Sequence, residues 1–270
     1  MTFITRPIIA LGQWAIDRLE FIGGVGYLMS DALVASRAAL FGKRGRRLGW
    51  TNLWAQMNRV GVRSIGIVSL VLICIGAILA LQMAPVLDDY GVLAQVADII
   101  SIAILRELGP LVSAIVLTGF AGASITAEIG SMVVSEEIEA MEAMAISPVR
   151  FLVVPRVLAT TIMMVCIAVV GDVMGILGGL ISAKFFLGLG VRQYLQHTFD
   201  IAQLQDFYTG LIKAAVFGML ISGLACYLGL KVTGGAQGVG VATTRTVVFT
   251  IVALIVVDLM FTSVFYVMGW

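Results

Sequence analysis

Two adjacent charged residues and a proline interrupt a stretch of this chain that is otherwise apolar enough to cross a membrane. Arg106 and Glu107 stand side by side, and Pro110 follows three residues later. A charge at the centre of a bilayer costs about 2.5–3.5 kcal/mol on insertion scales, so such side chains usually face protein or water instead of lipid. We expect Arg106 and Glu107 to line a cavity that opens outward and to contact a polar group of a bound molecule there.

Asp172, Lys213 and Asp258 also lie inside apolar stretches. At a rise of about 1.5 Å per residue, all five charges fall in the outer half of the membrane. Neighbouring residues of a helix point about 100° apart, so Arg106 and Glu107 cannot pair face to face, and each needs its own partner. We predict a pair between Asp172 and Lys213. The alternative is that all five charges are satisfied in contacts between helices.

The composition requires a membrane. The chain has 270 residues, of which 60% are apolar and 12% charged, whereas about 25% of a soluble domain is charged. The net charge of +1 excludes an electrostatic footprint for nucleic acid. Each of the three cysteines lies in a different apolar run, and His197 stands in a polar loop without a companion ligand, so we predict neither a disulfide nor a metal site. The cysteines are Cys74, Cys166 and Cys226.

Five runs are long enough to span roughly 30 Å of hydrocarbon, which predicts an all-α integral membrane protein with a single domain, residues 1–270. We place the spans at 64–86, 98–120, 151–183, 208–230 and 245–268. The third is long enough to tilt or to break near Gly171. Gly171, Gly175 and Gly179 form a row at the spacing that lets two helices approach closely, and the alternative is general glycine richness in a chain with 30 glycines.

Residues 1–47 are predicted to form an interfacial helix and a basic loop, and residues 48–270 the five-span region. Apolar residues recur at helical spacing near the N-terminus, and nearby charges break the run. The apolar residues are Ile8, Leu11, Ala15, Leu19 and Ile22. A soluble helix packed on the ends of the spans is the alternative.

Basic residues predict the orientation. Nine of them precede the first span, and the loop after that span has none. They are Arg6, Arg18, Arg37, Lys43, Arg44, Arg46, Arg47, Arg59 and Arg63. This distribution places the N-terminus in the cytoplasm and the C-terminus outside, and makes the acidic segment 121–150 cytoplasmic.

The acidic segment contains a candidate coupling helix. Residues 136–145 suit a helix that ends at Ser147-Pro148, with Ile138, Met141, Met144 and Ala145 on one face. A short amphipathic helix of this kind can dock into a groove of a partner protein. The alternative is a solvated acidic loop.

Three motifs make the chain resemble the MlaE/YrbE permease family, the membrane subunits of bacterial ABC transporters that move lipids together with MCE-domain proteins. They are Leu105-Arg106-Glu107-Leu108-Gly109-Pro110, then residues 121–130 (AGASITAEIG), then the Glu137-containing helix that ends at Ser147-Pro148. Further matches are residues 213–218 (KAAVFG) and 238–248 (GVGVATTRTVV). The similarity covers about residues 50–268.

The resemblance implies a homodimer in the inner membrane of a bacterial cell, with the N-terminus cytoplasmic and the C-terminus periplasmic. It implies a cytoplasmic ABC ATPase that uses ATP and Mg, a STAS-domain protein that binds the ATPase, and a periplasmic MCE-domain protein. The implied function is movement of phospholipid between the inner membrane and the MCE protein, which maintains the lipid asymmetry of the outer membrane. No cofactor is expected on this chain.

The resemblance also implies the site residues. Arg106, Glu107 and Leu108 would bind substrate, together with Leu81 and Gln82 of the first span. A second group would couple to the ATPase, and it consists of Glu128, Glu136, Glu137, Glu139, Met141, Glu142 and Met144. Many relatives have an arginine where this chain has Phe120, so the role of that position at the cytoplasmic mouth is open.

The chain lacks a phosphate-binding loop, since Gly42-Lys43-Arg44-Gly45 does not have the required spacing, so we expect a partner to hydrolyse ATP and this chain not to be an enzyme. Two other functions remain open from the residues. One is an ion-coupled secondary carrier that uses Glu107, Asp172 and Asp258 as a relay. The other is a membrane scaffold that transports nothing.

Overall fold

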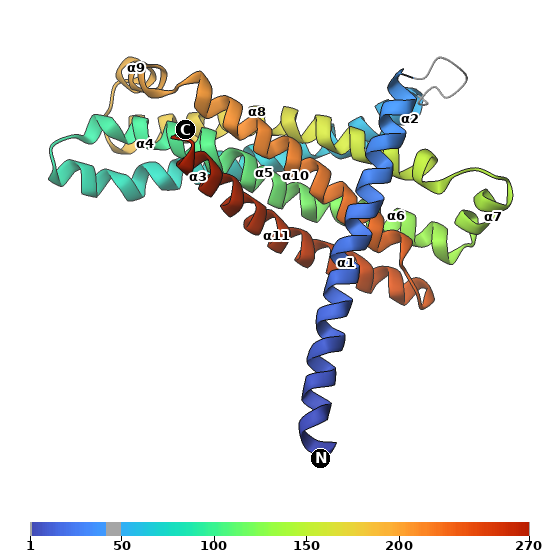
Figure 1. The fold of residues 1–270 in the computed structure, drawn as a ribbon. Coiled ribbons are helices and arrows are strands. Elements are labelled where there is room, and N and C mark those ends of the chain that lie inside the picture. The colour runs from blue at the N-terminus through green and yellow to red at the C-terminus, as the bar shows by residue number, and fades with distance from the viewer. Residues whose placement is uncertain (1, 42–49, 270) are drawn as a thin grey trace.

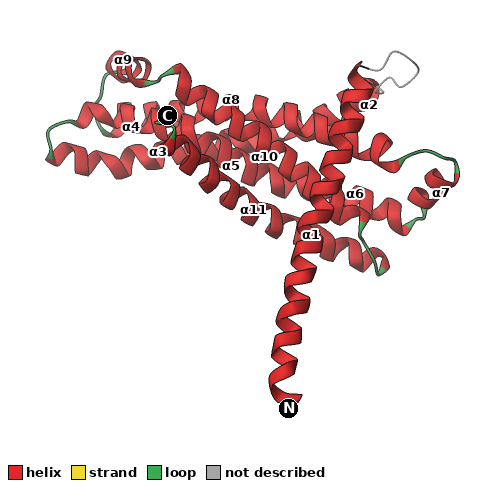
Figure 2. Ribbon diagram, in the orientation of Figure 1, coloured by secondary structure: helices red, strands yellow, loops and turns green. Residues whose placement is uncertain are grey.

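The computed structural model describes residues 2–41 and 50–269, and these residues form helices joined by short connections, without a β-strand (Figure 2). Five helical stretches in the described residues are long and apolar enough to cross a membrane. They are Asn52–Asp89, Leu93–Val134, Val149–Phe186, Leu204–Leu230 and Gly235–Val267. The prediction of an all-α membrane protein with five spans is confirmed.

The first three spans are built from several helical segments. The first span contains α2 (Trp50–Met57) and α3 (Arg63–Asp89), and the second contains α4 (Val96–Ala103), α5 (Gly109–Leu117) and α6 (Ala123–Val134). α8 (Val154–Phe186), α10 (Leu204–Leu230) and α11 (Gly235–Val267) form the others. π-helical turns join or precede these segments at Asn58–Val62, Ile104–Leu108, Thr118–Gly122 and Val149–Val153.

The second span runs further than the sequence predicted. It continues as α6 to Val134 instead of ending at residue 120, because Ile125 and Ile129 are buried against the other helices. The connection to the third span is correspondingly shorter than the predicted segment 121–150. The fifth span likewise begins at Gly235 instead of residue 245. The third span is continuous through Gly171 and does not contain the break that its length allowed there.

Three helices lie outside the spans: α1 (Thr2–Phe41), α7 (Glu137–Ala143) and α9 (Val191–Ile201). α7 marks one end of the bundle and α9 the other (Figure 1), and we call these the α7 end and the α9 end. The prediction that His197 stands in a loop is wrong, because the residue lies in α9. Its Nδ1 lies 3.2 Å from Asp98 Oδ1.

α1 crosses the bundle near the α7 end, and its N-terminal half extends beyond the other helices (Figure 1). Phe21 packs edge-on against Tyr227 of α10, with 5.4 Å between ring centroids. Leu19 and Ile22 of the predicted apolar face are 69% and 66% exposed, as expected for a helix that meets lipid with that face. The structure does not describe the side chains of three residues of the predicted apolar face, Ile8, Leu11 and Ala15. The basic residues within 43–47 lie outside the described residues.

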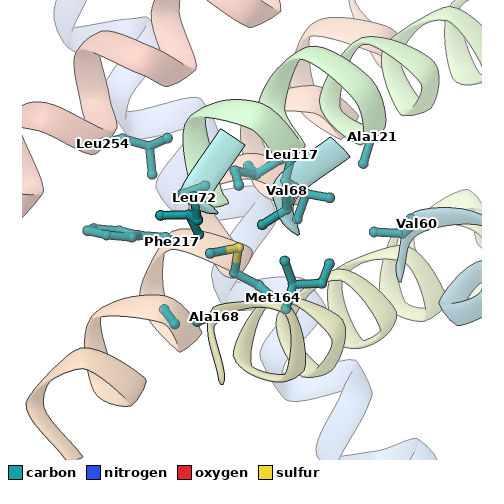
Figure 3. Close-up of a cluster of buried hydrophobic side chains, with 13 residues drawn as sticks. Val60, Val68, Leu72, Leu117, Ala121, Met164, Ala168, Phe217 and Leu254 are labelled. Carbon is teal, nitrogen blue, oxygen red and sulfur yellow. The ribbon is translucent and has the colours of Figure 1, made fainter. Parts of the chain in front are cut away.

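The centre of the bundle is apolar and unites all five spans. Val68 and Leu72 of α3, Leu117 of α5, Met164 of α8, Phe217 of α10 and Leu254 of α11 meet in one buried cluster (Figure 3). Lipid is as apolar as these side chains, so their close packing, more than the expulsion of water, holds the helices together.

The glycine row of α8 brings α3 and α8 into backbone contact, as its spacing predicted. A Cβ atom added at Gly76 of α3 would lie 1.9 Å from the Gly175 carbonyl oxygen. A Cβ atom at Gly178 would lie 2.1 Å from the carbonyl oxygen of Ile73. Side chains at these positions would therefore force the two spans apart.

We predict that Gly76→Val destabilises the protein by about 1–3 kcal/mol or more, because the added side chain overlaps backbone that cannot move independently. Gly66→Val on the same helix is the control, since a Cβ atom at Gly66 meets nothing within 4 Å. Thermal unfolding of the purified protein in detergent compares the two. Equal midpoints for both variants would contradict the close approach of α3 and α8.

Candidate functional site

The buried amine of Lys213 organises a cluster of polar side chains from three spans toward the α9 end. Lys213 Nζ lies 2.6 Å from Glu107 Oε2 and 2.9 Å from Asp258 Oδ1, and the lysine side chain is 1% exposed. It also donates to Thr262 Oγ1 at 2.9 Å. Thr262 in turn donates to Glu107 Oε1 at 2.9 Å. A buried ammonium needs such compensation, because desolvation of an unpaired charge is expensive.

Arg106 turns away from this cluster and pairs with Asp206, which is 3% exposed. The second carboxylate oxygen of Asp206 accepts a hydrogen bond from the Gln203 backbone at 3.0 Å, so the same aspartate caps the start of α10. The prediction that Arg106 and Glu107 take separate partners therefore holds. The two side chains are joined to the same helix, α10, through Asp206 and Lys213.

A small cavity of about 120 Å³ opens beside these groups. Arg106, Glu107 and Lys213 contribute its charged lining, and the remaining lining residues are Thr209, Thr262, Phe265 and Tyr266. The side chains of Arg106 and Glu107 are 37% and 35% exposed, so each still presents part of its charge to the cavity. This arrangement can hold a polar group that carries both an anionic and a cationic part.

The local backbone explains why both charges reach the cavity region. Arg106 and Glu107 lie in the π-helical turn Ile104–Leu108, directly before Pro110. A proline has no backbone N–H and clashes with the preceding turn, which favours such a widened turn. π-helical turns of this kind are frequent at functional sites.

The predicted pair between Asp172 and Lys213 is wrong. Asp172 is 3% exposed and lies against Gly109, where an added Cβ atom would overlap its Oδ1. That oxygen has no hydrogen-bond partner among the described residues. Asp172 projects from α8 toward α5 there, and Lys213 instead takes the carboxylates of the second and fifth spans, Glu107 and Asp258.

The other predicted substrate residues do not line this cavity. Leu108 packs with Ala80 and Ile104 in a separate apolar cluster. Leu81 is 42% exposed and Gln82 is exposed on α3. A role in binding substrate stays a prediction for these three residues.

At the opposite end of the bundle, Glu128 of α6 is held by two arginines. Its carboxylate lies 2.8 Å from Arg59 Nη1 and 3.1 Å from Arg156 Nη2. Arg156 is almost fully buried and also donates to the Leu152 carbonyl oxygen at 2.9 Å. Glu128 therefore joins the first three spans, a structural role that the sequence analysis did not foresee.

A cavity of about 230 Å³ adjoins this ion pair. Phe120 lines it together with Arg59 and Arg63. Position 120 therefore carries no charge itself but lies at the same cavity as two arginines near the start of the first span.

α7 presents acids outward and packs one methionine inward. Glu136 begins it in the left-handed conformation with a φ of 61°, and Met141 is buried. Ile138 is half-buried, but Met144 is 64% exposed and Ala145, with a φ of 58°, has left the helix. The predicted apolar face is therefore divided, with two residues against the bundle and Met144 available to a partner. The exposed acids are Glu136, Glu137, Glu139 and Glu142.

Asp206 and Thr262 were missed from the sequence. Asp206 follows Gln203 by three residues at the start of a span, which is a capping signal that could have been recognised. Thr262 lies one helical turn after Asp258, and its hydroxyl oxygen lies 3.0 Å from the Asp258 carbonyl oxygen. Only the packing of α11 against the second span reveals that Thr262 also contacts Glu107.

Comparison with known proteins gives a consistent match. The family model described as permease MlaE matches residues 53–264. A probable ABC transporter permease protein of Rickettsia typhi is 35% identical over 211 residues, which cover 78% of this chain and 82% of the relative. The intermembrane phospholipid transport system permease protein MlaE of Haemophilus influenzae is 31% identical over 266 residues, covering 97% of this chain and 98% of that protein.

A more distant relative comes from a plant. The chloroplastic protein TRIGALACTOSYLDIACYLGLYCEROL 1 of Arabidopsis thaliana is 27% identical over 238 residues, which cover 88% of this chain and 68% of the plant protein.

We predict that Lys213→Met destabilises the protein by about 3–5 kcal/mol, because it leaves Glu107 and Asp258 close together without the ammonium that balances them. Adding Glu107→Gln and Asp258→Asn to the same protein removes the uncompensated charge and restores most of the loss. Thermal unfolding in detergent measures all variants. Lys184→Met, at an exposed lysine near the α9 end, is the control and has little effect. If Lys213→Met alone were as stable as the unmodified protein, Lys213 would not organise this cluster.

Proposed function

The chain belongs to the MlaE permease family and is an ABC transporter permease, and on this premise we propose that it moves phospholipids across or out of the inner membrane of a bacterium. A permease of this kind works as the membrane subunit of a larger transporter. The observation that best supports this proposal is the cavity within the spans, where Arg106 and Glu107 keep part of their opposite charges exposed. Phosphate and amine groups of a lipid headgroup are complementary to such a pair.

The size of the cavity supports a headgroup site completed by a second copy of the chain. At about 120 Å³ it is smaller than the roughly 300–1,000 Å³ of typical ligand sites, so acyl chains must extend beyond it. Its walls include Phe265 and Tyr266 of α11, the span with the smallest buried share, 11%. We propose that two copies face each other across this open side and enclose the acyl chains, with Leu81, Gln82 and Leu108 at the edge of the shared cavity.

ATP hydrolysis in the proposed transporter comes from a cytoplasmic ABC ATPase that binds ATP and Mg. We propose that α7 docks into this ATPase through Glu137, Glu139, Glu142 and the exposed Met144, while Met141 anchors α7 to the bundle. Closure of the ATPase would then move α7 and, through the continuous helical stretch Leu93–Val134, the turn that carries Arg106 and Glu107.

The proposed orientation follows the basic residues before the first span. The α7 end and the N-terminus face the cytoplasm, and the α9 end and the C-terminus face the periplasm. An MCE-domain protein would receive or deliver lipid at the α9 end, next to the cavity, and a STAS-domain protein would bind the ATPase. Exchange of phospholipid with the MCE protein would maintain the asymmetry of the outer membrane.

We predict that Glu107→Gln lowers phospholipid transfer at least ten-fold while the protein remains folded. Lys213 keeps Asp258 as its counter-ion in this variant, so the cluster loses its exposed carboxylate but not its internal balance. The measurement is transfer of labelled phospholipid by the reconstituted transporter, with Asp88→Asn, at an exposed residue of α3, as the matched control.

The same assay separates the proposal from its rivals. Transfer that stops without ATP and survives collapse of the proton gradient supports the ABC mechanism, and the reverse pattern indicates an ion-coupled carrier. If the Glu107→Gln protein were present at normal abundance and transferred phospholipid at an unchanged rate, Glu107 would have no role in binding the headgroup.

We predict that Glu142→Lys releases the ATPase, because it reverses a charge on the exposed side of α7. Copurification of the ATPase with tagged chain is the measurement. Asp31→Lys, the same charge change at an exposed position of α1, retains the ATPase. Loss of the ATPase from both variants, or from neither, would argue against docking through α7.

A further inference from the structure

A third cavity, larger than the two described above, lies at the α7 end, at the opposite end of the bundle from the site that contains Arg106 and Glu107. It has a volume of about 630 Å³ and is lined by α1, the end of α10 and the start of α11. Nothing in the proposed transport path uses it. Its size lies within the range of small-molecule binding sites.

The charges of this cavity suit a single anion. Lys231 and Arg245 line it, and among the described side chains that line it Glu20 of α1 is the only acid. These described lining residues carry a net charge of +1, from two cations and one carboxylate. A phosphodiester carries one negative charge and accepts hydrogen bonds at two free oxygens, which matches this balance.

Tyr227 positions one of these cations. Tyr227 lines the cavity and is 7% exposed, and its hydroxyl is buried next to Gly24 of α1. Lys231 Nζ lies over the Tyr227 ring, 4.8 Å from its centroid. α11 begins at Gly235 beside this group without a side-chain cap, so its first backbone N–H groups are open to an anion.

The position of the cavity identifies the source of the anion. The fourth span ends at Leu230 and the fifth begins at Gly235, so the cavity lies at the ends of two candidate spans, where we expect lipid headgroups. α1 crosses the bundle here (Figure 1), and its exposed Leu19 and Ile22 lie on the face of α1 that is turned away from the cavity-lining residues Glu20 and Phe21. Apolar side chains exposed at this depth require lipid acyl chains around them.

We propose that this cavity binds the phosphate of an anionic phospholipid from the leaflet at the α7 end. Lys231, Arg245 and the first backbone N–H groups of α11 hold the phosphate, and the acyl chains extend past Val241, which lines the cavity and is 46% exposed. The bound lipid fastens α1 to the ends of the fourth and fifth spans. This site requires only that the chain is inserted in a membrane, so it stands independently of the proposed transport of phospholipids.

Native mass spectrometry of the full chain, purified in detergent with its copurifying subunits, tests the proposal. Phosphatidylglycerol is the titrated probe, and the number of bound lipids and their dissociation constants are measured. Lys231→Gln combined with Arg245→Gln weakens one binding event at least ten-fold. Lys184→Gln combined with Arg192→Gln, which removes two exposed cations near the α9 end, leaves it unchanged.

A second pair of variants fills the cavity without altering its charge. Val241→Trp places an indole into the cavity that Val241 lines, and it abolishes the same binding event. Val248→Trp, at an exposed position of the same helix outside the cavity, preserves it. Glu107→Gln also preserves it, which separates this site from the proposed transport site.

Three outcomes overturn the proposal. Unchanged lipid binding by both the charge and the filling variants shows that no lipid occupies the cavity. Loss with Val241→Trp alone indicates an acyl chain without phosphate recognition. Competition by soluble glycerol phosphate at the concentration at which phosphatidylglycerol binds assigns the site to a free phosphate compound instead of a lipid.

Discussion

A buried ammonium determines how the α9 end of this protein is built. Lys213 is 1% exposed, and its charge is tolerable only because Glu107 and Asp258 approach it from the second and fifth spans. Three of the five spans must therefore keep their relative positions for the cluster to remain neutralised. Glu107 is tied to Lys213 on one side and open to the cavity on the other, so any ligand at the cavity acts directly on the contacts that hold these spans.

The second span connects this cluster with the opposite end of the bundle. It carries Arg106 and Glu107 in one π-helical turn, and Glu128 two segments later, where Arg59 and Arg156 hold it. It then leads directly to α7. In contrast, α3 and α8 touch through glycines and leave little freedom to move relative to each other. The tight α3–α8 pair thus serves as a frame, and the second span is the element that can transmit movement between the two ends.

Much of the fold could be predicted from the sequence, because lipid imposes simple requirements on the chain. Five apolar stretches of sufficient length, a glycine row at the spacing for close helix contact, and an N-terminal helix whose apolar run is broken by charges were all recognisable. Ends of spans were harder to place. Residues 121–134 and 235–244 are polar or small enough to resemble loops, yet they remain helical because tertiary contacts, such as those of Ile125 and Ile129, cover one side.

For the candidate site, the sequence alone determined which charges lie within the spans and that Arg106 and Glu107 need separate partners, since both follow from hydropathy and helix geometry. It could not determine the partners. Lys213 takes Glu107 and Asp258 instead of Asp172, and Arg106 takes Asp206, a residue that also caps a helix. Such pairings depend on how far each helix is rotated about its axis and which helices are neighbours, and packing across the whole bundle sets both.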